Sequence, residues 1–100
     1  MGRVAYKETI RRAIRTYGED AQKAVAIEEM AELQKEICKD LRHGGSYDHI
    51  AEEIADVEIM LEQLKIMYEC QTDVQQWIYR KLQRLKERMD REQAAREGMA

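Results

Sequence analysis

Residues 28–56 read EEMAELQKEICKDLRHGGSYDHIAEEIAD, and they contain two acidic pairs of the same internal spacing. The first pair is Glu29-x-x-Glu32 and the second is Glu53-x-x-Asp56. Between them lie 20 residues that include the only Gly-Gly of the chain. An α-helix turns by about 100° per residue, so residues i and i+3 share a face. If two helices fold back on each other at the Gly-Gly, we expect the four carboxylates to meet at one place.

The second acidic pair interrupts a stripe of apolar residues. On a helical wheel, Glu53 and Asp56 fall within or beside the stripe formed by Ile50, Ile54, Val57, Met60, Leu61 and Leu64. Charged side chains are rarely buried unless they are paired or bind a metal. Glu36 follows the first pair by one turn on the same face. Carboxylate oxygens in this number suit Mg²⁺ or Mn²⁺, and the lack of Cys or His within either pair argues against zinc.

Composition and length predict one all-α domain. The chain has 100 residues, 44% of them hydrophobic, with no Pro and few Gly. We expect a first helix over residues 3–17 and a second that runs from an N-cap at Asp20 to about Arg42. A third helix should run from a cap at Ser46 or Asp48 to about Cys70. The fourth should begin at a Thr72–Gln75 capping box and extend to about Asp90. The domain should therefore span residues 1–90. Residues 91–100 have lost the apolar stripe, so we expect them to be a frayed or disordered tail.

Charge, cysteine usage and hydropathy restrict the cellular setting. The net charge of −3 weighs against nucleic-acid binding, and no apolar segment approaches the length of a membrane span. Cys38 and Cys70 are isolated, as expected for free thiols of a reducing compartment. The N-terminal residues lack the apolar core of a signal peptide. We therefore expect a cytoplasmic protein with no membrane partner.

Other carboxylate chemistries fit the sequence less well. Ferritin-like di-iron bundles need Glu-x-x-His, which is absent at the paired positions. Glycoside hydrolysis needs a larger cleft than so short a chain provides. His43 and His49 both lie near the Gly-Gly turn, where a capping or solvent-exposed role is the simpler interpretation, and no nucleophilic triad is evident.

The chain resembles the MazG-like, all-α nucleoside triphosphate pyrophosphohydrolases over roughly residues 20–90. The resemblance is carried by the two acidic pairs, their spacer and the Gly break, which match the Glu-x-x-Glu…Glu-x-x-Asp signature of that family. The resemblance is to the small single-domain type. It implies a four-helix bundle in which an antiparallel helix pair carries the metal site, assembled as a homodimer or homotetramer. Apolar residues over a wide arc of the expected helices also favour self-association.

The resemblance also implies an activity and its residues. Mg²⁺, or Mn²⁺ as a substitute, would be bound by Glu29, Glu32, Glu53 and Asp56, which are the expected catalytic residues. Attack by water on the triphosphate would give a nucleoside monophosphate and pyrophosphate. Separately from the resemblance, Glu28 and Glu36 are our candidates for orienting the water, because they are acidic residues beside the expected ligands. Substrate phosphates would be held by Lys81 and Arg84, which lie in a segment similar to the basic segment of the family. Leu82 and Leu85 stand where the family often has Phe, so Trp77, Tyr79 and Tyr68 are the candidates for stacking on the base.

The alternative hypothesis is a non-catalytic helical-bundle adaptor whose acidic rows face solvent. Its support is the content of charged residues, 37%, which suits exposed helical surfaces. Its difficulty is the position of Glu53 and Asp56 within an apolar stripe, which an adaptor does not require.

Overall fold

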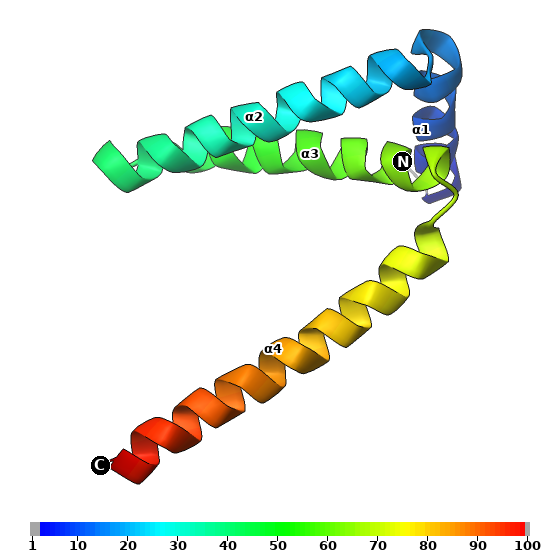
Figure 1. Cartoon of the computed structure of the whole chain (residues 1–100). Helices are drawn as coiled ribbons and strands as arrows, with labels where there is room; N and C mark the ends of the chain where they lie inside the picture. The colour runs from blue at the N-terminus through cyan, green and yellow to red at the C-terminus, as the bar shows by residue number, and fades with distance from the viewer. Residues whose placement is uncertain (1–2, 100) are drawn as a thin grey trace. The chain divides into compact units, whose positions relative to one another are not determined.

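The computed structural model describes the backbone of residues 3–99 and the side chains of residues 6–98. Over these residues all regular structure is helical, which confirms the all-α class. The four helices are α1 (Arg3–Tyr17), α2 (Glu19–His43), α3 (Tyr47–Met67) and α4 (Gln71–Met99) (Figure 1). Within the described residues, no helix is both long enough and apolar enough to cross a membrane. Residues 1, 2 and 100, which belong to the predicted domain and tail, lie outside the described residues.

The chain divides into two compact units. Residues 1–69 form the first unit, with α1, α2 and α3, and residues 70–100 form the second, with α4. The single domain predicted over residues 1–90 crosses this boundary and stays a prediction.

Gly18 separates α1 from α2. Its φ of 90° lies in the region that glycine adopts without a steric penalty, and its N–H donates to the carbonyl oxygen of Ile14 at 2.8 Å. The helix α2 then begins at Glu19, with Gly18 as an N-cap that provides no side-chain hydrogen bond. The N-cap predicted at Asp20 is therefore wrong, because this residue already lies in the first turn. A carboxylate there still interacts favourably with the helix dipole.

A three-residue connection, Gly44–Ser46, joins α2 to α3. Gly44 has a φ of 78°, and its N–H donates to the carbonyl oxygen of Asp40 at 3.0 Å. The Gly45 N–H donates to Asp40 Oδ1, also at 3.0 Å, and a Cβ at Gly45 would lie 3.2 Å from the Asp40 Cβ. Ser46 Oγ accepts from the His49 N–H at 3.4 Å, so Ser46 is the cap of α3. The predicted break at Gly44-Gly45 is confirmed.

The boundary between α3 and α4 differs from its prediction. α3 ends at Met67 rather than near Cys70, and Glu69 has a positive φ of 51°, which is uncommon for a residue with a side chain. α4 begins at Gln71, so the capping box predicted at Thr72 is wrong: that residue is already inside the helix. The sequence has no Gly at this turn, so the composition does not indicate that α3 ends at Met67.

The packing of the first unit is centred on α2 and α3. These two helices pack against each other, and α1 contacts both of them near the end remote from the Gly-Gly turn (Figure 1). Among the described side chains, the buried apolar ones are Ile10, Ala26 and Met60. Several large apolar side chains of α2 and α3 are exposed, including Ile27, Ile37, Leu41, Ile54 and Leu61. Few apolar side chains of this unit are thus fully buried, although others, such as Leu33, Val57 and Leu64, are half-buried.

The second unit is the amphipathic helix α4. Its exposed apolar side chains are Trp77, Ile78, Leu82, Leu85 and Met89. The charged groups of Arg80 and Lys81 lie 5.3 Å and 5.9 Å from the centre of the Trp77 ring. The helix continues to Met99, past the point at which the sequence predicts fraying, and the side chains of residues 91–98 are all exposed.

Candidate functional site

Three carboxylates from two helices meet in the first unit. Glu29 of α2 and Glu53 and Asp56 of α3 each bring one oxygen within 4.8 Å of the other two. All three side chains are half-buried. Glu53 and Asp56 share a face of α3 because they are three residues apart, and Glu29 lies on the face of α2 that meets it. We call these three residues the acidic cluster.

The fourth carboxylate predicted for this site, Glu32, lies beside the acidic cluster. Its side chain is exposed, and it is not among the three residues whose oxygens converge. Its charge nevertheless acts on the cluster, because it helps to raise the pKa of Glu29 and of Glu53. The role of Glu32 as a metal ligand stays a prediction.

Both Glu29 and Glu53 hold their protons more tightly than free carboxyls. The pKa of Glu29 is raised from its ordinary value of 4.5 by desolvation first, and then by the charges of Asp56 and Glu53. Desolvation also comes first for Glu53, followed by the charges of Asp56, Glu32, Glu52 and Glu36, and together these raise its pKa. Both shifts have the same origin, which is negative charge gathered where water is partly excluded. A cation at this place would relieve the repulsion.

One oxygen of the acidic cluster has no hydrogen-bond partner. Glu53 Oε2 is buried, and no donor among the described residues reaches it. Buried polar atoms without a partner are rare because they lose hydration without compensation. An oxygen with free lone pairs beside two further carboxylates is the donor set that Mg²⁺ and Mn²⁺ prefer. The residues present are therefore chemically suited to a hard divalent cation.

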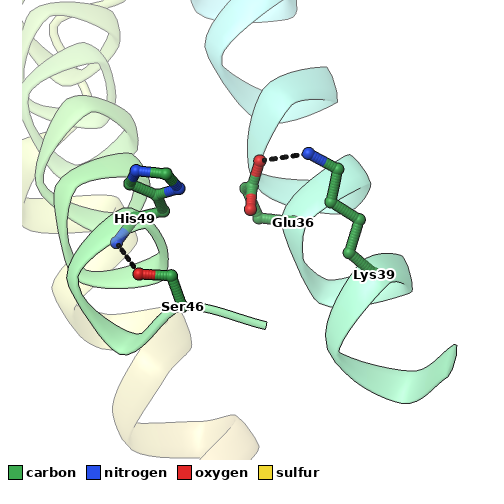
Figure 2. Close-up of polar contacts among 4 residues, drawn as sticks. All are labelled: Glu36, Lys39, Ser46 and His49. Atoms are coloured by element: carbon green, nitrogen blue, oxygen red, sulfur yellow. Dashed lines mark hydrogen bonds and ion pairs between the residues drawn. The ribbon is translucent and has the colours of Figure 1, made fainter. Parts of the chain in front are cut away.

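Glu36 adds a buried carboxylate next to the acidic cluster. Its side chain is on the side of α2 that faces α3, and it forms an ion pair with Lys39 at 3.3 Å (Figure 2). Its charge is among those that raise the pKa of Glu53. Glu28 is exposed and is not among those charges. Of the two residues considered for orienting a water, Glu36 has the more suitable position.

The residues predicted to bind phosphates lie on α4, in the second unit. Lys81 and Arg84 are exposed and, together with Leu85, Glu87, Arg88 and Arg91, they line an open hollow on this helix. Four of these six side chains are basic, so the hollow can attract an anionic group. The role of Lys81 and Arg84 in holding a substrate stays a prediction.

The three aromatic candidates for stacking on a base are all accessible. Tyr68, Trp77 and Tyr79 have exposed fractions of 61%, 48% and 67%. The Lys23 ammonium lies 4.7 Å from the centre of the Tyr68 ring, and Trp77 has the two cations described above. Their surroundings do not single out one of the three.

A pair of buried glutamines near the acidic cluster was not predicted from the sequence. Gln22 of α2 and Gln63 of α3 are buried and share a hydrogen bond of 2.7 Å. Gln22 precedes Glu29 by seven residues, and Gln63 follows Asp56 by seven residues. The equal spacing in two helices was the signal that could have revealed this pair.

No family profile matches the chain, and comparisons with curated proteins and with solved structures found no match either. The resemblance to MazG-like enzymes therefore rests on the sequence motifs quoted above.

Proposed function

We propose that this protein is a Mg²⁺-dependent nucleoside triphosphate pyrophosphohydrolase, which converts a ribo- or deoxyribonucleoside triphosphate and water to the monophosphate and pyrophosphate. The observation that carries the proposal is the acidic cluster, in which three carboxylates from two helices converge. One of these carboxylates, that of Glu53, has a buried oxygen without a hydrogen-bond partner. This is where an all-α pyrophosphohydrolase of the MazG-like type would hold its metal.

The proposal includes an antiparallel arrangement of α2 and α3 around the metal. It is supported by the contacts between the two helices, because Gln22 near the start of α2 bonds to Gln63 near the end of α3. Glu29, further along α2, approaches Asp56, which comes earlier in α3. The connection of three residues at Gly44–Ser46 is typical of helices that run in opposite directions.

Glu29, Glu53 and Asp56 would hold the cation, with Glu32 as a further ligand from the edge of the cluster. When bound, Mg²⁺ supplies positive charge to the triphosphate oxygens and favours the deprotonation of water. Desolvation at Glu29 and Glu53 strengthens the attraction of these carboxylates for a cation. Their negative charge also excludes an uncomplexed triphosphate, so the substrate must arrive with its charge partly neutralised.

Glu36 would orient the attacking water and accept its proton. The water oxygen forms a bond to one of the two phosphorus atoms of the α–β anhydride, and the bond from that phosphorus to the bridging oxygen breaks. The bridging oxygen stays with the other phosphorus, and the two products are the monophosphate and pyrophosphate. The ion pair with Lys39 holds the Glu36 carboxylate in one orientation. Lys81 and Arg84 would bind the phosphates of the substrate, where their charges stabilise negative charge in the transition state.

The active assembly would be a homodimer or a homotetramer. Apolar side chains spread over a wide arc of α2, of α3 and of α4 support this part of the proposal, because a chain of 100 residues has little further material with which to cover them. Large exposed apolar surfaces are uncommon on soluble monomers, and symmetric association is the usual way to cover them.

Incubation of the purified protein with a panel of canonical and modified nucleoside triphosphates and Mg²⁺ tests the proposal. We expect pyrophosphate and a monophosphate, and no activity after chelation of the metal. Release of orthophosphate instead would indicate another phosphohydrolase. No hydrolysis of any member of the panel would leave the helical adaptor as the better explanation, since exposed apolar helix faces serve that function as well.

A further inference from the structure

The hydrogen bond between Gln22 and Gln63 is a buried polar contact between α2 and α3. Their exposed fractions are 7% and 3%, and Gln22 Nε2 donates to Gln63 Oε1 at 2.7 Å. Gln63 Nε2 in turn donates to Met60 Sδ at 3.7 Å. Both groups of the Gln63 amide are thus engaged, which fixes its orientation.

This pair and the acidic cluster lie in one row of the interface between the helices. Seven residues are two turns of an α-helix, or about 10.5 Å along the axis, and they return to nearly the same face. Gln22 and Glu29 are separated by that interval in α2, and Asp56 and Gln63 are separated by it in α3. A contact that fixes the two glutamines therefore also fixes how Glu29 and Asp56 face each other.

Few apolar side chains are fully buried between the helices. Within the described part of the chain these are Ala26 of α2 and Met60 of α3, while Leu33, Val57 and Leu64 are half-buried. Apolar side chains can slide past one another, whereas the hydrogen bond between the two amides exists in one register alone. The connection at Gly44–Ser46 restrains only one end of the pair. A shift by one helical turn, about 5.4 Å, would move the carboxylates further than the 4.8 Å within which they now converge.

We propose that Gln22 and Gln63 are positioning residues of the acidic site, whose mutual hydrogen bond sets the register of α2 against α3 and so brings Glu29 to Glu53 and Asp56. The role in metal binding rests on the proposed function, but the role in register does not. A buried polar side chain at a single layer has the same effect in coiled coils, where it specifies register at a cost in stability.

The test replaces both glutamines by methionine, which is similar in length and unbranched. Gln22→Met with Gln63→Met removes both partners, so no buried polar group is left unsatisfied and the fold should keep its stability. The matched control is Gln34→Met, because Gln34 is on α2 but exposed. Register is measured without metal, from the distance between nitroxide labels on cysteines introduced at Ala24 and Leu61, both exposed, with Cys38 and Cys70 replaced by serine. The dissociation constant for Mn²⁺ is measured separately, on unlabelled protein.

With the native glutamines we expect a single narrow distribution of the distance between the labels. In the double variant this distribution should broaden, or its centre should shift by up to about one helical turn. The Mn²⁺ dissociation constant should rise at least about tenfold, while helical content and melting temperature stay close to those of the Gln34→Met control. An unchanged label distance would overturn the proposal, and so would an Mn²⁺ affinity within about twofold of the native value.

Two further outcomes are distinguishable. If the native protein binds no Mn²⁺, the proposed function fails, and the label distance alone decides whether the glutamines set the register. If the double variant does not fold, Gln22→Leu with Gln63→Leu is judged by the same two measurements, because this pair also removes both amides and leaves no buried polar group without a partner.

Discussion

Replacing Glu53 by glutamine tests the acidic cluster most directly. The change keeps the size of the side chain and removes one of three converging carboxylates, so the formal charge of the cluster falls from −3 to −2. Loss of an outer-shell partner of a metal ligand typically costs 10–100-fold in affinity or activity. A ligand that supplies an otherwise unpartnered oxygen should matter more, so we expect pyrophosphohydrolase activity to fall by more than about 100-fold.

The same variant should be more stable than the native protein when no divalent cation is present. Desolvation and neighbouring charges raise the pKa of Glu53 above its ordinary value of 4.5. The unfolded chain therefore releases this proton at a lower pH than the folded protein. As a result, the free energy of unfolding decreases as the pH rises from the ordinary pKa to the raised one, and it stays lower above that range. Glu53→Gln should melt at a higher temperature than the native protein at pH 7, and this advantage should disappear below the ordinary pKa.

The assay is pyrophosphate release at saturating Mg²⁺, together with thermal melting in chelator at several pH values. Glu62→Gln is the matched control, because Glu62 is on α3 but pairs with Lys65 at 2.5 Å rather than joining the acidic cluster. Removing that pair should cost only a few tenths of a kcal/mol and leave the activity unchanged. Normal hydrolysis by Glu53→Gln would show that Glu53 takes no part in the chemistry. An unchanged melting temperature across the pH series would refute the electrostatic account.

Four other outcomes are expected. Mg²⁺ at about 100 times its dissociation constant should raise the free energy of unfolding by about 2.7 kcal/mol, a rise in melting temperature on the order of 10 °C, whereas no response to Mg²⁺ or to chelator would contradict metal binding. Lys81→Ala with Arg84→Ala should raise KM for the triphosphate roughly tenfold relative to a Gln83→Ala control, and an unchanged KM would remove these residues from the substrate site. Light scattering coupled to size exclusion at micromolar concentration should give a mass above that of one chain, and a fully active species of 11.8 kDa would exclude the oligomer. Ser46→Ala should lower the free energy of unfolding in urea by about 1 kcal/mol because it removes the cap of α3, and an unchanged midpoint would show that this cap is dispensable.

Helix positions were predictable where glycine and apolar spacing agree. The range 3–17 matches α1, because Gly18 ends the helix with a φ that few other residues adopt. Caps were less predictable: Asp20 and Thr72 have suitable side chains, but in each case the helix already begins at the residue before them. A residue caps the start of a helix only if its own backbone lies outside the helical conformation, and composition does not determine that.

The sequence predicted that the two acidic pairs come together, but it did not predict which of their carboxylates belong to the acidic cluster. Periodicity places Glu29 and Glu32 on one face of α2, but these positions differ by about 60° around the axis. The rotation of α2 against α3 decides which of them points inward, and the structure leaves Glu32 exposed. Periodicity in apolar and charged residues carries no information on uncharged amides, so the burial of Gln22 and Gln63 was not predictable from it.

The short connection at Gly44–Ser46 also bears on the order of folding. Closing a loop of three residues loses little chain entropy, so pairing of α2 with α3 should start beside it and spread outward. Glu36 lies nearest the turn, Glu29 and Asp56 meet next, and Gln22 and Gln63 meet last, at the greatest separation along the chain. As pairing of α2 with α3 proceeds from the turn, the carboxylates of Glu29, Glu53 and Asp56 therefore come together, and repel one another, before Gln22 and Gln63 can form their hydrogen bond. A divalent cation should therefore speed refolding, in addition to stabilising the folded protein.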